Sequence, residues 1–222
     1  MHFGAAGMIV FGVRAPLVVD YEIAAQRHGR PVMLGISLGG HPRMMFTSRI
    51  VDLSDVTDAD LGPVLPCAFA PERRAVLAQI AVARGFTLAD SLIDPAAVLP
   101  PGFRMDAAGF INAGAVIGGG CLFGEGVLVN RSASIGHHVV LCDWVSIGPG
   151  AVLSGNIRIG ARSMIGAGAV LQSDIRIGSD VLVAAGSVVR KSVPDNHLVS
   201  GNPARCVLRR AVPSTLGREG DE

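Results

Sequence analysis

Apolar residues in the second half of the chain recur at every sixth position. From residue 93 to residue 189 each sixth residue is large and apolar, and the phase never slips. An amphipathic helix would need a spacing near 3.6 residues, and a sandwich strand would need strict alternation. A period of six predicts short strands separated by turns, as in a hexapeptide β-helix. The series is Ile93, Leu99, Met105, Ile111, Ile117, Phe123, Val129, Ile135, Leu141, Ile147, Leu153, Ile159, Ile165, Leu171, Ile177, Val183 and Val189.

Two further positions of the hexad agree with this prediction. Gly often follows the large residue, as at Gly136 and Gly160, where we expect it to supply the backbone freedom of a tight turn. Two positions before the large residue a small one is common, as at Ala133 and Ala151. We therefore expect the large residues to point inward and to stack between coils, with parallel strands about 4.8 Å apart.

The first ninety residues follow a different pattern, in which short apolar runs alternate with helical segments. Strands are predicted at residues 8–12, 31–36, 49–53 and 63–69, and helices at residues 17–28 and 71–84. Each helix begins near a Pro and is followed by a Gly, which suits its two ends. The alternation indicates a small parallel α/β domain. The predicted organisation is an α/β domain over residues 1–90, a β-solenoid over 91–206 and a polar tail over 207–222.

Composition excludes several classes of protein. The 19 Lys and Arg residues nearly balance 18 Asp and Glu residues, and the formal net charge is +1. We therefore expect no nucleic-acid partner, because such proteins usually carry a basic surplus. The cysteines form no C-x-x-C pair, which favours free thiols in a cytoplasmic protein. They are Cys67, Cys121, Cys142 and Cys206.

One segment has the length of a membrane span. Residues 107–124 are uncharged and mostly apolar, and a run of about 18 such residues is normally a transmembrane candidate. Six of them are Gly, which is a poor helix former, and the segment lies within the six-residue repeat. Residues 1–16 also lack the pattern of a secretory signal peptide. We expect no membrane association and a cytoplasmic location.

Two segments carry candidate chemistry. Acyl transfer from a thioester needs a general base, a donor for the oxyanion and a cleft for the acyl carrier. Of six His residues only two lie in the solenoid, at the end of the strip Asn130-Arg131-Ser132-Ala133-Ser134-Ile135-Gly136-His137-His138. The second segment closes the repeat and reads Ser200-Gly201-Asn202-Pro203-Ala204-Arg205.

The repeat and these two segments resemble the left-handed hexapeptide-repeat acyltransferases. The α/β domain before the repeat makes the chain similar to bacterial sugar acetyltransferases, which include bacillosamine and perosamine N-acetyltransferases and sialic acid O-acetyltransferases. The resemblance implies a left-handed β-helix in which three hexads form one triangular coil. It also implies acetyl-CoA as co-substrate, a small-molecule sugar that is nucleotide-linked, and no metal. Family members are homotrimers whose active sites lie between two prisms.

The resemblance assigns roles to residues of the first segment. His137 matches the general base, and imidazole suits this task because its pKa lies near neutrality. Asn130 begins the family's active-site strip. His138 stands where the family usually has an Asp or Glu that orients the base. One coil, or three hexads, beyond His137 is Gly155, whose N–H is our candidate donor to the oxyanion.

The resemblance also assigns the coenzyme A site. The closing segment is similar to the family's Gly-x-Pro-Ala-Lys signature, and it gives Gly201, Asn202, Pro203, Ala204 and Arg205 as candidates. Arg in place of Lys retains a positive charge for a phosphate. Further cations stand at Arg190 and Lys191, and small residues one coil apart would leave a groove for the pantetheine arm. These small residues are Ala167 and Ala185.

Two expectations concern the substrate and the trimer. The family's Gly-rich turn after the first strand corresponds here to residues 12–16, so Gly12 and Arg14 are candidates for binding the nucleotide. A flat solenoid face rich in Val and Ile would promote aggregation if it were exposed to solvent. We therefore expect this face to be an interface between subunits. Trp144 and Val145 are candidates for that interface.

Three functions remain open on the sequence. The first is N-acetylation of a nucleotide-linked amino sugar, and O-acetylation of a sugar is close to it. The second is a zinc hydrase of the same fold, which would need spaced His ligands on stacked coils. His137 and His138 are adjacent, so zinc is not expected. The third is a binding or assembly protein that kept the scaffold without catalysis.

Overall fold

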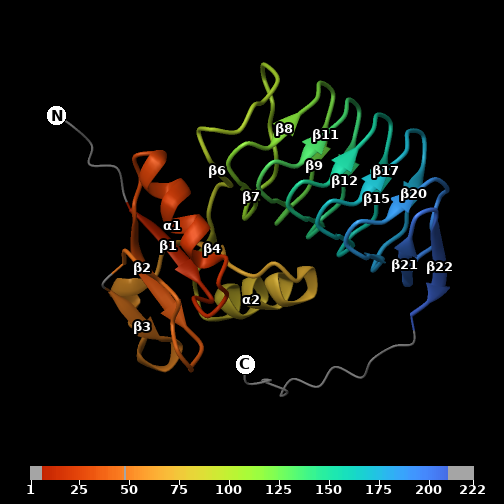
Figure 1. The fold of residues 1–222 in the computed structure, drawn as a ribbon. Helices are drawn as coiled ribbons and strands as arrows, with labels where there is room; N and C mark the ends of the chain where they lie inside the picture. The colour runs from red at the N-terminus through yellow and green to blue at the C-terminus, as the bar shows by residue number, and fades with distance from the viewer. Residues whose placement is uncertain (1–6, 48, 210–222) are drawn as a thin grey trace.

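The computed structural model describes residues 7–47 and 49–209, which form an α/β domain and a β-solenoid (Figure 1). Most of the predicted polar tail lies outside the described residues. The α/β domain has a parallel five-stranded sheet of order β3-β2-β1-β4-β5. Its strands are β1 (Met8–Phe11), β2 (Val32–Ser37), β3 (Ile50–Asp52), β4 (Pro63–Pro66) and β5 (Thr87–Leu88). Its helices are α1 (Val18–Arg27), α2 (Pro71–Ala83) and the short 3₁₀ helices η1 (Leu53–Asp55) and η2 (Asp58–Asp60).

The solenoid is a triangular prism made of two-residue strands. One face contains β6 (Leu92–Ile93), β7 (Phe110–Ile111), β10 (Leu128–Val129), β13 (Ser146–Ile147), β16 (Met164–Ile165) and β19 (Leu182–Val183). The second contains β8 (Val116–Ile117), β11 (Ser134–Ile135), β14 (Val152–Leu153), β17 (Val170–Leu171) and β20 (Val188–Val189). The third contains β9 (Leu122–Phe123), β12 (Val140–Leu141), β15 (Arg158–Ile159) and β18 (Arg176–Ile177).

One face is named for the domain that covers it, and the other two are named for their outward-facing residues. The covered face, which contains β7 and β10, packs against the α/β domain. The valine face, which contains β8, β11, β14, β17 and β20, presents Val116, Val152, Val170 and Val188. The arginine face, which contains β9, β12, β15 and β18, presents Arg158 and Arg176. Within each face every third strand of the repeat pairs in parallel, as β10 does with β13, so three hexads make one coil as expected.

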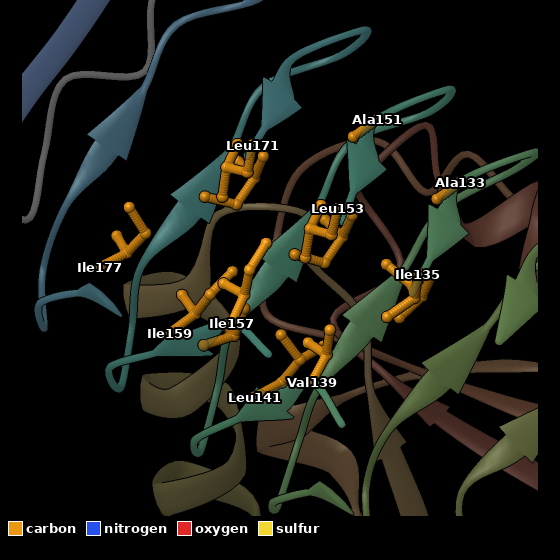
Figure 2. Close-up of a cluster of buried hydrophobic side chains, with 14 of the residues drawn as sticks. Ala133, Ile135, Val139, Leu141, Ala151, Leu153, Ile157, Ile159, Leu171 and Ile177 are labelled. Carbon is orange, nitrogen blue, oxygen red and sulfur yellow. The ribbon is translucent and has the colours of Figure 1, made fainter. Parts of the chain in front are cut away.

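The inward residues form a continuous apolar core. Figure 2 shows Ile135, Leu153 and Leu171 stacked from coil to coil, with Ala133 and Ala151 beside them. All five side chains are buried, as the hexad pattern predicts. A column of equivalent residues buries apolar surface at every step, which makes the prism stable through contacts between neighbouring coils.

The glycines that follow the large residues have a role other than the expected one. Their backbone conformation is not left-handed; the left-handed residue stands two positions later, at His138, Arg162 and Asp180 for example. A Cβ on Gly136 would instead lie 2.6 Å from the carbonyl carbon of Ser154. Gly is therefore needed there because adjacent coils approach each other closely at the corners.

A buried arginine joins the α/β domain to the solenoid. Arg74 of α2 is fully buried, and its guanidinium donates to the carbonyls of Ala68, Gly126 and Val145. Burial lowers the pKa of Arg74 to about 10. On the other side of the contact the ring of Tyr21 in α1 packs on Phe110 of β7, with centroids 4.2 Å apart. The two parts therefore share one packed interface.

The expected subunit contact at Trp144 and Val145 is wrong for Val145. Its side chain is fully buried within the prism of a single chain. Its position two residues before Ile147 is the inward small-residue position of the hexad, which explains the burial. The Trp144 ring lies over Gly126 of the preceding coil, where a Cβ would meet it at 2.2 Å.

The repeat ends with a shortened coil and a hairpin. Val193 pairs with Ile177 and Val199 with Val183, so the step between paired strands is shorter here than in the preceding coils. The hairpin consists of β21 (His197–Gly201) and β22 (Ala204–Leu208), and β21 continues the covered face beside β19. In the described part of the chain no helix is long and apolar enough to span a membrane.

Candidate active site

The two solenoid histidines lie at the corner between the valine face and the arginine face. His137 and His138 lie between β11 and β12, separated from β11 by Gly136, and both side chains are exposed. Their Nδ1 atoms are 3.0 Å apart, and the rings are nearly perpendicular, with an interplanar angle of 80°. The pair is therefore joined by a hydrogen bond between Nδ1 atoms.

Each imidazole lies on a glycine of an adjacent coil. A Cβ on Gly155 would lie 2.6 Å from Nε2 of His137, and a Cβ on Gly120 would lie 2.8 Å from Cδ2 of His138. Real Cβ atoms essentially never approach so closely. The two glycines thus make room for the two rings, and Gly155 lies against His137 as the coil spacing predicts.

One backbone N–H group near His137, that of Gly155, takes no part in the hydrogen bonds between coils. Asn156 donates its N–H to the carbonyl of His137, and Asp174 donates to the carbonyl of Gly155. The N–H of Gly155 donates to no carbonyl in the described part of the chain. Gly155 itself is buried and lies against the His137 ring, and its N–H stays our candidate donor to the oxyanion.

Asn130 lies apart from His137, at the opposite end of β11. Its Oδ1 accepts hydrogen bonds from the Arg131 N–H at 2.7 Å and from Asn112 Nδ2 at 3.1 Å. Asn112 and Arg131 both bind the carboxylate of Asp20 in α1. Within one chain Asn130 therefore belongs to the polar contact between α1 and the covered face.

The coenzyme A candidates occupy two corners. Ala167 and Ala185 are exposed at the corner between the covered face and the valine face. Lys191 stands on the His137 corner three coils further along, and Arg190 precedes it; both are exposed. Arg205 lies on β22 and pairs with Ser200 of β21.

The closing hairpin stands at the far end of the covered face. Gly201, Asn202 and Pro203 form its exposed tip, and Ala204 is half-buried. A single chain therefore does not bring the hairpin or the small-residue corner to His137. The hairpin and the small-residue corner therefore lie apart from the histidine corner within one prism.

The nucleotide candidates lie at the carboxyl edge of the α/β sheet. Gly12, with φ of 90°, directly follows β1, and the Arg14 guanidinium packs against Gly40, where a Cβ would lie 2.5 Å from Cζ. Ligands of open parallel sheets bind at this edge. Asp52 at the end of β3 accepts the N–H of Gly39 at 3.0 Å and so holds the same loop.

The sequence reasoning missed the anchor of that loop. Glu22 of α1 is almost fully buried, and its carboxylate accepts the N–H groups of Met45, Phe46 and Thr47 at 2.7 to 3.0 Å. Hydrogen bonds from Ser54 and Gly39 lower the pKa of Asp52, the second carboxylate that holds this loop. No local signal marks Glu22, because its partners lie more than twenty residues away.

The sequence reasoning also missed two stacked arginines beside the histidines. Arg158 and Arg176 pair in register on β15 and β18, and both are exposed. They line a hollow of about 340 Å³ that also contains His138, Asn156 and Asp174. Like charges directly opposite each other destabilise a strand pair, so an anion in the hollow would relieve them. The sequence signal was the triplet Arg-Ile-Gly, which recurs one coil later.

No grouping of three or more His, Cys, Asp or Glu residues suited to a metal occurs among residues 7–47 and 49–209. The cysteines are free, and Cys67 is fully buried. Burial raises the pKa of the Cys67 thiol above its ordinary range. The described side chains thus offer acid–base and hydrogen-bonding groups at the site.

Comparison with known proteins agrees with this geometry. Residues 156–191 match the family model "Bacterial transferase hexapeptide (six repeats)". The acetyltransferase domain of PglB from Neisseria gonorrhoeae, solved with acetyl coenzyme A, is 28% identical with a TM-score of 0.79, and the match covers 92% of this chain and 100% of that one. PerB from Caulobacter crescentus, solved with CoA and GDP-perosamine, is 25% identical with a TM-score of 0.82, covering 91% and 97%.

A more distant structure shares the fold alone. WeeI from Acinetobacter baumannii is 22% identical with a TM-score of 0.77, and the match covers 91% of this chain and 100% of that one. A search of curated proteins found no match. The chain is thus a left-handed β-helix protein with an N-terminal α/β domain. Within that class it is similar to hexapeptide-repeat acyltransferases.

Proposed function

We propose that this protein transfers the acetyl group of acetyl-CoA to the amine of a nucleotide-linked amino sugar. The observation that carries the proposal is the His137 imidazole seated on Gly155 at a corner of the solenoid. The likeness to PglB and PerB extends over both the solenoid and the α/β domain. Their solved complexes contain acetyl coenzyme A in one case and CoA with GDP-perosamine in the other.

The mechanism follows from the groups at the corner. Nε2 of His137 accepts a proton from the sugar amine while the amine nitrogen bonds to the thioester carbon. The N–H of Gly155 donates to the oxyanion of the tetrahedral intermediate. When the intermediate collapses, the carbon–sulfur bond breaks and His137 returns the proton to the leaving thiolate.

A homotrimer would complete the site. The histidine corner and the small-residue corner with Ala167 and Ala185 are the two edges of the valine face. Val116 and Val152 on that face are 45% and 41% exposed, which is high for a column of valines. If the valine face is the subunit contact, the small-residue corner of one chain approaches the histidine corner of the next. Asn130 of one chain would then also lie near His137 of another.

Cations around this cleft suit the phosphates of both substrates. We assign Arg190, Lys191 and Arg205 to coenzyme A, and Arg158 with Arg176 to the diphosphate of the nucleotide sugar. Guanidinium groups bind phosphate oxygens with charge-assisted hydrogen bonds.

The remaining candidates bear on the nucleotide and on the closing hairpin. We assign Gly12 and Arg14 to the nucleotide itself, at the edge of the α/β sheet. The hairpin residues Gly201 to Ala204 would border the coenzyme. The reaction belongs in the cytoplasm, where thiols such as the exposed Cys206 stay reduced.

The test is an acetyl-transfer assay with purified protein. Acetyl-CoA is offered with UDP- and GDP-linked amino sugars and with their hydroxyl analogues, and release of the free thiol is followed. His137→Ala should lower kcat by about 10² to 10⁴, the usual contribution of a general base. His28→Ala is the matched control, because His28 is an exposed histidine at the end of α1.

Each possible result has a clear meaning. Turnover of an amine substrate that His137→Ala abolishes and His28→Ala retains supports the proposal. Turnover of the hydroxyl analogues alone would replace N-acetylation by O-acetylation. Absence of both turnover and acetyl-CoA binding at millimolar concentration would leave a non-catalytic scaffold.

A further inference from the structure

The hydrogen bond between the two histidines constrains their protonation. Nδ1 of His137 and Nδ1 of His138 are 3.0 Å apart, so one must donate a proton and the other must accept it. A neutral imidazole carries its proton on only one nitrogen. The neutral pair therefore has two states, and only one of them leaves Nε2 of His137 unprotonated.

We propose that His138 is a positioning residue that makes His137 a base at Nε2. In this state Nδ1–H of His137 donates to Nδ1 of His138, and His138 carries its own proton on Nε2. A neutral imidazole thus performs the orienting task for which a carboxylate is the usual partner. The inference rests on the proposed function, because the base it orients is the base of that reaction.

The backbone fixes His138 for this role. Its φ is 54°, a left-handed conformation that few residues other than Gly adopt and that Asn, Asp and His tolerate better than most. This conformation turns the side chain back along the corner, where the ring lies on Gly120 of the preceding coil. The equivalent positions in the following coils are Asn156 and Asp174, whose side chains hydrogen-bond to each other at 3.1 Å.

The surroundings of the two rings differ. The charged groups that line the hollow beside His138 are Arg158, Arg176 and Asp174. His137 lies against the uncharged backbone of Gly155. The ring of His138 is the acceptor within hydrogen-bond distance of Nδ1 of His137.

The solenoid itself suggests variants that fold. Gly, Asn and Asp already occupy the equivalent left-handed position in the coils around His138. His138→Asn places an amide oxygen on Cγ, where Nδ1 stands now, and keeps an acceptor that does not titrate. His138→Asp places a carboxylate there, and His138→Gly removes the acceptor. Asn196→Gly is the matched control, since Asn196 has φ of 59° far from the histidines.

The experiment combines pH profiles with nitrogen NMR of the histidine rings. His138→Gly should lower kcat about tenfold or more with KM little changed, and ¹⁵N shifts should show loss of the Nδ1–H form of His137. His138→Asn should restore both the Nδ1–H form and most of kcat. His138→Asp should also keep the Nδ1–H form of His137, because its carboxylate accepts the same proton. Asn196→Gly should resemble wild type.

Two outcomes separate this inference from the proposed function. If His137→Ala abolishes turnover but His138→Gly keeps the wild-type kcat, pH profile and ring shifts, the inference is overturned while the function stands. If no acetyl transfer is found but the ¹⁵N shifts of His137 depend on residue 138 as described, the hydrogen-bonded pair stands and the function fails. Equal loss of activity in the Gly and Asn variants would also overturn it.

Discussion

Replacing Gly155 by Ala tests how closely the catalytic corner is fitted. The backbone at Gly155 is not left-handed, so Ala meets no conformational penalty there. The new methyl group would lie 2.5 Å from Cε1 and 2.6 Å from Nε2 of His137, whereas ordinary contacts lie at 3.4 to 4 Å. The ring must therefore move by about 1 Å, and a displacement of this size can cost about 10²-fold in rate.

The expected result of Gly155→Ala is a loss of about 100-fold in kcat, equivalent to about 2.7 kcal/mol of transition-state stabilisation. Because the His137 side chain is exposed and free to swing away, the melting temperature should change little. The assay is steady-state acetyl transfer together with thermal unfolding.

The chain offers a matched control for this variant. Gly119 occupies the same place in the corner one coil before His137, and a Cβ there would meet nothing within 4 Å. Gly119→Ala should keep wild-type activity. In a His137→Ala background, Gly155→Ala should have no further effect on the chemical step. Activity of Gly155→Ala within threefold of wild type would refute the argument that the ring is held on this glycine.

Three further predictions concern stability and substrate binding. Arg74→Met should lower the free energy of unfolding in urea by about 3 kcal/mol, because buried carbonyls of both domains lose their donor; an unchanged midpoint would contradict this. Arg158→Gln should raise KM for the nucleotide sugar about tenfold and leave KM for acetyl-CoA unchanged, since it removes one charged phosphate contact. Equal effects on both KM values would contradict the assignment of Arg158 to the diphosphate. Stability should fall as pH rises above about 9, because burial raises the pKa of Cys67 and Tyr21 and the unfolded chain loses these protons first; Cys67→Ala should flatten this alkaline slope in urea titrations.

The period of six determined most of the fold in advance. The unbroken six-residue repeat predicted the inward residues and the short strands of the prism, and the resemblance to hexapeptide-repeat acyltransferases supplied the step of three hexads between coils. Four of the five strands of the α/β domain and both of its α-helices were also predicted, with ends that differ by at most three residues; β5 was missed, and the strand expected at residues 63–69 ends at Pro66. Such ends depend on hydrogen bonds between distant segments, which local patterns do not contain.

The site was predictable only along the solenoid axis. The step from His137 to Gly155 is one full coil, so the sequence places one against the other. Asn130 is different, because its surroundings depend on Asp20, more than one hundred residues earlier in the chain. The orientation of His138 depends on its positive φ, which the sequence does not signal for a histidine. Contacts between the domains and backbone conformation at single corners therefore required the structure.

The corners of a solenoid are well suited to carry chemistry because they contribute little to its stability. The inward column must remain apolar in every coil, since each coil is stabilised by its neighbours. The left-handed position of a corner, unlike the glycine position two residues before it, needs only a residue that accepts the backbone conformation of the turn. At one such position the chain has Gly120, His138, Asn156 and Asp174 in consecutive coils, all left-handed. The same backbone conformation thus carries no side chain at Gly120, an imidazole at His138, an amide at Asn156 and a carboxylate at Asp174. The imidazole of His138 fits because the preceding coil has Gly120 at this position.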